Sequence, residues 1–355
     1  FLAERFVHKA SRAWIALLGV CFLSGLISAA VENVAVVLIM APIAFFIAER
    51  LRINPINLII GIAISSNLQG VATMIGDPPS LLLTSYAKLN FNDFFVFDGK
   101  PGLFFAVQIG AIASLVVLYF FFKNYHQETE KILGARIRSH FPGFLLVLMI
   151  VLLALTSMTH YSGSSSALSF IDEYKAGFIC LITGLIAWIW YYDENKEDFM
   201  PMAKRLDWET GLFLIAIFVL VESLVKVSFM ETTASFIASL VGNNAFLAFN
   251  VILWSSVLFS GFVDNVPYIA AMLPVVGNLA KFMGVAPHLL LFGLVIGASV
   301  GGNITPVGAS ANIVAMGLLK KKGYKPSFWQ FVKIGLPFTI IAVIASAGFV
   351  WLMFS

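Results

Sequence analysis

Three carboxylates stand inside strongly apolar stretches of this 355-residue chain. Glu32 and Asp264 are each followed by Asn-Val, and Asp77 lies in the sequence Gly-Asp-Pro-Pro. A charge at the centre of a bilayer costs about 2.5–3.5 kcal/mol on insertion scales. Each acid must therefore face a polar cavity, contact a partner or hold a proton. The alternative for Glu32 and Asp264 is a loop carboxylate at the membrane surface.

The neighbours of these acids add polar groups that could contact a ligand. Asn33 and Asn265 each carry both a hydrogen-bond donor and an acceptor, which suits a polar site, although either could instead cap a helix. Prolines after Asp77 bias it away from helical geometry, so nearby carbonyls lose helical partners and could coordinate a cation. The helix that restarts there favours an anion at its N-terminus, and Asp77 could simply cap that helix.

Two apolar segments are interrupted by small polar residues, glycine and proline, at positions 65–80 and 297–312. They align without a gap at an offset of 293 − 61 = 232 residues, and the same offset places Glu32-Asn33 on Asp264-Asn265. Lipid offers no hydrogen bonds, so backbone groups freed by a break must face protein or a polar cavity. Two interrupted segments in corresponding positions of two halves are a pointer to a transporter's binding site.

We therefore expect a substrate or ion site made by both interruptions and both acidic turns. Its glycines would let the backbone approach a ligand closely, or else serve only tight helix packing. No catalytic residue, metal site, nucleotide motif or cofactor is expected, since the five histidines show no metal spacing. The residues predicted to line the site are Glu32, Asn33, Gly70, Thr73, Gly76, Asp77, Ser80, Asp264, Asn265, Gly302, Asn303, Thr305, Gly308, Ser310 and Asn312.

The composition predicts which elements position these residues. The chain is 60% hydrophobic and 12% charged, with a mean hydropathy of +0.93. Soluble domains carry about 25% charged residues. The chain is therefore expected to be an all-α polytopic membrane protein. The net charge of +3 reflects membrane topology and does not indicate nucleic-acid binding.

Apolar runs on both sides of each acidic turn predict two helical hairpins, each followed by a discontinuous helix. An odd number of crossings separates the two discontinuous helices, so the two repeats are inverted. We expect a first repeat at 1–122, linking loops and scaffold helices at 123–209, and a second repeat at 210–355. The second repeat is preceded by a helix with no counterpart before Phe1, so the first scaffold helices are expected to be missing from this sequence.

The distribution of basic residues predicts the orientation. Sixteen lysines and arginines gather on one side of the predicted membrane, against four on the other. Cytoplasmic loops carry the excess of positive charge. The basic loops 123–140, 193–209 and 320–327 are thus expected in the cytoplasm. The membrane is expected to be the plasma membrane of a bacterium or archaeon.

Four motifs carry a resemblance to a known family: Gly70–Ser80, Val263–Pro267, Gly301–Asn312 and Gly323–Trp329. They resemble the ion transporter superfamily, and within it the arsenite permease and P-protein (pink-eyed dilution) group of citrate-transporter-like permeases. The resemblance covers nearly the whole chain. It implies a scaffold domain for dimerisation, a transport domain with two re-entrant hairpins and two broken helices, and elevator-type movement.

The resemblance also indicates the chemistry. Sodium–dicarboxylate carriers of the related group have Ser-Asn-Thr at the hairpin tips and Thr before Pro-Pro. At the positions that resemble these motifs, this chain instead has Glu32-Asn33-Val34, Asp264-Asn265-Val266 and Asp77-Pro78-Pro79. Acids thus replace neutral ligands, which favours coupling to protons or handling of a cation such as Na⁺. A buried carboxylate can exchange protons near neutral pH.

We therefore expect a secondary active transporter of a small inorganic ion or solute, not an enzyme. Arsenite or antimonite efflux, sodium/proton antiport and small-anion transport all stay open. A passive channel on the same fold is the alternative, because broken helices can also line a pore. Membrane lipid and a second copy of the chain, bound through the scaffold helices, are the expected partners, and a separate ATPase subunit stays open.

Overall fold

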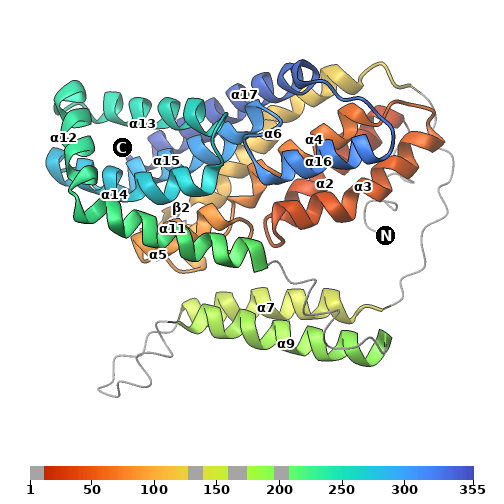
Figure 1. Ribbon diagram of the computed structural model, residues 1–355, viewed down its shortest axis with the longest axis horizontal. Helices are drawn as coiled ribbons and strands as arrows, with labels where there is room; N and C mark the ends of the chain where they lie inside the picture. The colour runs from red at the N-terminus through yellow and green to blue at the C-terminus, as the bar shows by residue number, and fades with distance from the viewer. Residues whose placement is uncertain (1–11, 127–138, 159–173, 196–207) are drawn as a thin grey trace. The chain divides into compact units, whose positions relative to one another are not determined.

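The structure is a computed structural model that describes residues 12–126, 139–158, 174–195 and 208–355, and these are almost entirely helical (Figure 1). The described chain forms two compact units. The first comprises residues up to Leu89, Asp93–Ala135 and Leu220–Ser355, and the second comprises Asn90–Asn92 and Arg136–Val219. Of the predicted basic loops, residues 127–138 and 196–207 lie outside the described part of the chain.

The first repeat begins with a helical hairpin. Its arms are α2 (Ala13–Ser28) and α3 (Asn33–Arg50), and they are followed by the discontinuous helix, which consists of α4 (Ile56–Gly70) and α5 (Pro78–Ala87). Proline is favoured in the first turn of a helix because its missing N–H has no helical partner there. The repeat continues through η1 (Asn92–Phe94) and the short antiparallel strands β1 (Val96–Phe97) and β2 (Lys100–Pro101) to α6 (Leu103–Phe122).

The second repeat follows the same plan. A short helix, α12 (Phe229–Val241), precedes the hairpin of α13 (Ala245–Ser260) and α14 (Asn265–Met283). The discontinuous helix consists of α15 (Pro287–Gly301), η2 (Gly302–Ile304) and α16 (Ser310–Lys321), and α17 (Phe328–Phe354) ends the repeat. Both ends of α13 lie 245 − 13 = 260 − 28 = 232 residues after those of α2, which is the offset found in the sequence.

The other unit contains α7 (Phe141–Ser157) and α9 (Lys175–Asn195), which pack side by side (Figure 1). A further helix, α11 (Trp208–Lys226), belongs to this unit up to Val219. The expected boundaries at 122, 209 and 355 follow the repeats and not these compact units, so they stay a prediction.

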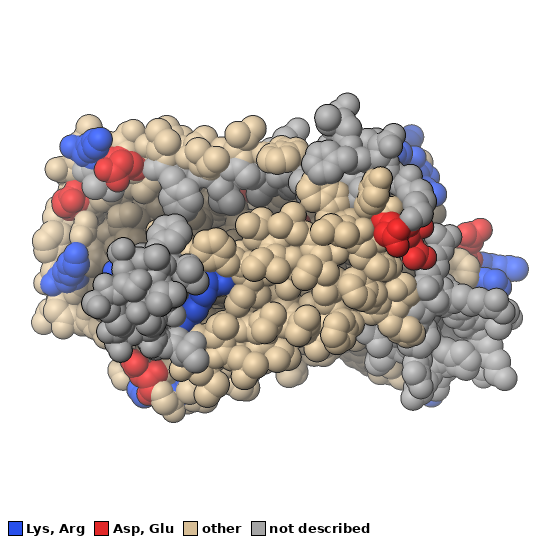
Figure 2. All heavy atoms as spheres, turned by 90° about the horizontal axis from the view of Figure 1, so that it is seen from below, with Lys and Arg blue, Asp and Glu red and all other residues tan. Residues whose placement is uncertain are grey.

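Six described helices are long and apolar enough to cross a membrane by length and composition. They are α3, α6, α9, α14, the segment Pro287–Ile304 and α17. Among the described residues in the view of Figure 2, uncharged side chains predominate, as lipid-facing helices require. The hairpins and discontinuous helices expected from the sequence are thus present.

Each discontinuous helix packs against the hairpin of the other repeat. Helix α5, from the first repeat, contacts α14 and α15, and α16, from the second, contacts α3 and α4. Helices α4 and α15 also contact each other. This exchange brings the two interruptions together inside one unit.

Candidate functional site

The turns of the two hairpins place their acids at the starts of α3 and α14. Glu32 occupies the N-cap position of α3, where Oε2 accepts a hydrogen bond from the backbone N–H of Ala35 at 3.0 Å. Asp264 occupies the same position on α14, and its Oδ1 accepts from Val266 N–H at 3.0 Å. A carboxylate at a helix N-terminus is favoured by the unpaired N–H groups and by the helix dipole.

The helix caps are therefore the acids Glu32 and Asp264. Asn33 and Asn265, for which capping was the alternative role, do not cap these helices. Both asparagines are buried in the first turn of their helices. The side-chain Nδ2 of Asn265 has no hydrogen-bond partner among the described residues, so it is available to a ligand.

A matched pair of threonines attaches each interruption to its own hairpin turn. The Oγ1 of Thr73 donates to the carbonyl oxygen of Ala29, and the Oγ1 of Thr305 donates to that of Gly261 at 2.5 Å. These residues correspond at the 232-residue offset, since 305 − 73 and 261 − 29 both equal 232. The broken segment and the acidic turn are thus held together in both repeats.

Gly76 and Gly308 lie where no side chain fits. A Cβ at Gly76 would collide with the carbonyl oxygens of Gly70 and of the hairpin turn, and a Cβ at Gly308 would meet the equivalent carbonyls, including that of Gly302 at 2.6 Å. The absence of a Cβ allows this close backbone approach. These contacts are the tight packing considered as the alternative for these glycines, and their contact with a ligand stays a prediction.

A group of three fully buried asparagines joins the two interruptions. The Nδ2 of Asn67, in α4, donates to the Oδ1 atoms of Asn303 and Asn312 at 2.8 and 2.9 Å. Asn303 in turn donates to the carbonyl of Ile64 at 3.0 Å. Asn312 donates to two backbone carbonyls of its own repeat. The second repeat's polar residues are therefore fixed against the first repeat.

Asp77 lies at this junction and is only 4% exposed. It precedes Pro78 in an extended conformation (φ −152°, ψ 143°), as the residue before a proline prefers. It makes no side-chain capping bond to α5, and its Oδ2 has no hydrogen-bond partner among the described residues. The negative charges of Glu32 and Asp264 both act on it, so three acids from two repeats share one region.

Residues around Asp77 complete a polar surface. The Cβ of Asp77 lies against Gly70, as does the Oγ of Ser28, which is buried without a hydrogen-bond partner in the described structure. Ser80 donates to the carbonyl of Val71 at 3.3 Å. Ser310, in the other repeat, donates to Asp264 Oδ2 at 3.2 Å.

Two residues of this region were missing from the set predicted from sequence. Asn67 could have been found as an asparagine that follows the apolar run of α4. Ser28 carries no such signal, because small hydroxyl residues are common in membrane helices and bond to their own backbone. Contact between the predicted site residues and a ligand stays a prediction.

The side chains and carbonyls at this junction suit a small charged or polar ligand. Among the described residues, no three His, Cys, Asp or Glu side chains are grouped as metal ligands. The available groups are carboxylates, amides, hydroxyls and backbone carbonyls. Ionisable residues in membrane segments mark ion and proton pathways.

Comparisons with known proteins agree with this organisation. The family model described as citrate transporter (CitMHS) matches residues 1–286 and 176–355. An uncharacterized transporter of Mycobacterium tuberculosis is 32% identical over 340 residues, covering 92% of this chain and 74% of the relative. The P protein of Mus musculus is 27% identical and covers 93% of this chain, which spans 48% of that protein.

Among solved structures, the YdaH transporter of Alcanivorax borkumensis matches with a TM-score of 0.63 at 14% identity, over 99% of this chain and 80% of that one. At this identity the match bears on the fold alone. It confirms the expected class: an all-α membrane protein with inverted repeats, two hairpins and two discontinuous helices, the elevator-type transporter fold. The chain is a multi-pass membrane protein and a transporter that belongs to the citrate transporter (CitMHS) family.

Proposed function

We propose that the protein is a secondary active transporter that moves a small inorganic ion or solute in exchange for, or together with, protons or a cation such as Na⁺. The main support is the position of Asp77, a buried acid on which the charges of Glu32 and Asp264 act, where the two interruptions meet. Three like charges in a low-dielectric region repel one another strongly. Binding a cation or proton relieves that repulsion.

The proposed roles differ between the acids. Glu32 and Asp264 each accept a backbone hydrogen bond at a helix N-terminus. Asp77 has an oxygen with no hydrogen-bond partner in the described structure, and its side chain makes no capping hydrogen bond to α5. It is the group proposed to take up the coupling ion, with substrate held by the polar groups of the hairpin turns and both interruptions.

The proposed movement is of the elevator type, in a homodimer held through scaffold helices. The hairpin turns and the interruptions are hydrogen-bonded to each other within each repeat, which supports their moving as one body. The proposed location is the plasma membrane of a bacterium or archaeon, with 320–327 in the cytoplasm. Three consecutive lysines at 320–322 support this orientation.

Ion flux into proteoliposomes tests the proposal. The purified full chain is reconstituted and assayed with a panel of cations, arsenite and small anions, with and without an imposed pH or Na⁺ gradient. Asp77→Asn and Asp264→Asn are compared with the parent and with Glu231→Gln, an exposed acid on α12. Gradient-driven flux is expected to fall at least tenfold in the first two variants and to persist in the control.

Unchanged gradient-driven flux in both acid variants would remove these acids from the mechanism. Flux that follows only the substrate's own electrochemical gradient, in the parent as well, would favour the passive channel. That second candidate rests on the same observation, because polar groups at two broken helices can also line a pore.

A further inference from the structure

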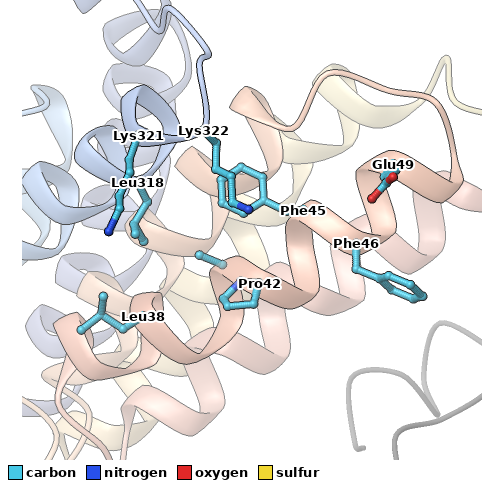
Figure 3. A pocket seen from close by; sticks show the side chains of 9 residues that line it. Leu38, Pro42, Phe45, Phe46, Glu49, Leu318, Lys321 and Lys322 are labelled. Atoms are coloured by element: carbon cyan, nitrogen blue, oxygen red, sulfur yellow. The ribbon is translucent and has the colours of Figure 1, made fainter.

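A cavity lies away from the proposed transport site, between α3 of the first repeat and α16 of the second. Its volume is about 530 Å³, within the range of small-molecule pockets. One wall is an apolar face of α3 formed by Leu38, Pro42, Phe45 and Phe46, and Leu318 of α16 faces it (Figure 3). Leu38 is 50% exposed, so this wall is open to the surroundings.

Two lysines line this cavity, and an arginine lies beside one of its aromatic residues. Lys321 and Lys322, at the end of α16, belong to its lining, and Lys320 precedes them in the same turn. Lys322 Nζ lies 5.9 Å from the centre of the Phe45 ring, and Arg50 lies over the ring of Phe46 at 5.4 Å. One acid, Glu49, also lines the cavity, on the opposite side from Lys321 (Figure 3).

The other repeat shows that such a cavity is not a necessary result of the fold. At the 232-residue offset, Phe45 corresponds to Gly277 and Leu318 to Tyr86. There Tyr86 of α5 packs directly against Gly277 of α14, at the place a Cβ would occupy. The first repeat's hairpin has the large Phe45 where the second has Gly277, so the two repeats differ at this contact.

The cavity combines the two features that recognise a charged lipid. The wall from Leu38 to Glu49 covers 12 residues, with about 16 Å of helix between its ends, and offers aromatic and aliphatic surface to an acyl chain. The lysines lie at the helix end, where a headgroup would be. Basic pockets between membrane helices on the cytoplasmic side bind anionic headgroups.

We propose that this cavity binds one anionic glycerophospholipid, with its phosphate between Lys321 and Lys322 and an acyl chain along Leu38 and Phe46. The two helices that form the cavity begin at the proposed transport site, since Glu32 caps α3 and Asn312 lies in the first turn of α16. A bound lipid would therefore bridge a hairpin of one repeat and a half-helix of the other.

Native mass spectrometry of the detergent-purified full chain tests this, with phosphatidylglycerol titrated against phosphatidylcholine of the same acyl composition. One phosphatidylglycerol should bind with clear preference. Lys321→Gln combined with Lys322→Gln should weaken its apparent affinity about 25-fold, from about fivefold per basic residue. The matched control removes two lysines at the corresponding pair of helices, Lys88→Gln after α5 and Lys281→Gln on α14, and should leave the affinity unchanged.

A second pair of variants tests the apolar wall. Leu38→Trp fills the cavity and should reduce bound phosphatidylglycerol, whereas Ile39→Trp, at a neighbouring position that is 59% exposed and outside the lining, should not. Equal binding of phosphatidylcholine, equal losses in both lysine pairs, or full displacement of the lipid by millimolar inorganic phosphate would each overturn the proposal. All four variants change exposed residues, so monodisperse size-exclusion profiles are expected throughout.

Discussion

Replacing Asn67 with leucine would test whether the asparagine group holds the two repeats together. The change keeps the side-chain volume but removes the donor of two hydrogen bonds, at 2.8 and 2.9 Å, and leaves the Oδ1 atoms of Asn303 and Asn312 without it. An orphaned buried acceptor costs about 1–3 kcal/mol. Hydrogen bonds between membrane helices average only about 0.6 kcal/mol, because the unfolded chain in a micelle or bilayer also finds partners.

These two figures bracket the expected loss for Asn67→Leu. Two average membrane hydrogen bonds give about 1.2 kcal/mol, and two orphaned acceptors in a fully buried position give about 2 kcal/mol at least. We expect about 2 kcal/mol, since all three asparagines are completely shielded from solvent. Equilibrium unfolding in mixed detergent micelles, followed by tryptophan fluorescence, measures this free energy.

The control is Ser114→Ala, which removes a buried hydroxyl whose single hydrogen bond within the described residues is to the carbonyl of Ala111 in its own helix. It should cost less than about 1 kcal/mol. Combining Asn67→Leu with Asn303→Leu should give losses that do not add, with a coupling of about 1 kcal/mol. The reasoning is refuted if Asn67→Leu costs no more than the control, or if the two asparagine losses add within about 0.3 kcal/mol.

Three further predictions follow from packing and orientation. Gly308→Ala should abolish transport because its Cβ meets three backbone carbonyls, while Gly348→Ala, in open space on α17, should keep flux in proteoliposomes. Gly110→Leu should reduce the yield of folded protein in fluorescence-detected size-exclusion chromatography, because α17 leaves no room there, and Gly348→Leu should not. In a background without the native cysteines, an impermeant maleimide should label Lys100→Cys from outside intact cells and Lys321→Cys only after permeabilisation; the reverse pattern would contradict the orientation.

Most of the architecture could be predicted because apolar composition identifies membrane helices and because the sequence contains two related repeats. The offset of 232 residues found by aligning Gly61 with Gly293 also relates the observed ends of α2 and α13. Proline and glycine marked both interruptions. The bend at Asp77 follows from the proline after it and is present.

The contacts between repeats could not be predicted in the same way. Periodicity says nothing about which helix of one repeat meets which helix of the other, so the role of Asn67 was not seen. The capping role of Glu32 was missed for a different reason. A residue at the start of a helix and a ligand in a polar cavity require the same acidic side chain, and only backbone geometry distinguishes them.

The hydrogen bonds from Thr73 and Thr305 to the hairpin turns limit how the polar site could open to solvent. Peeling a hairpin tip away like a flap would break these bonds and expose the carbonyls packed against Gly76 and Gly308. Lipid supplies no replacement partners for such groups. In the proposed mechanism, a bound substrate would therefore move together with the hairpins and broken helices that surround it. The surface along which this body slides would lie outside the polar site.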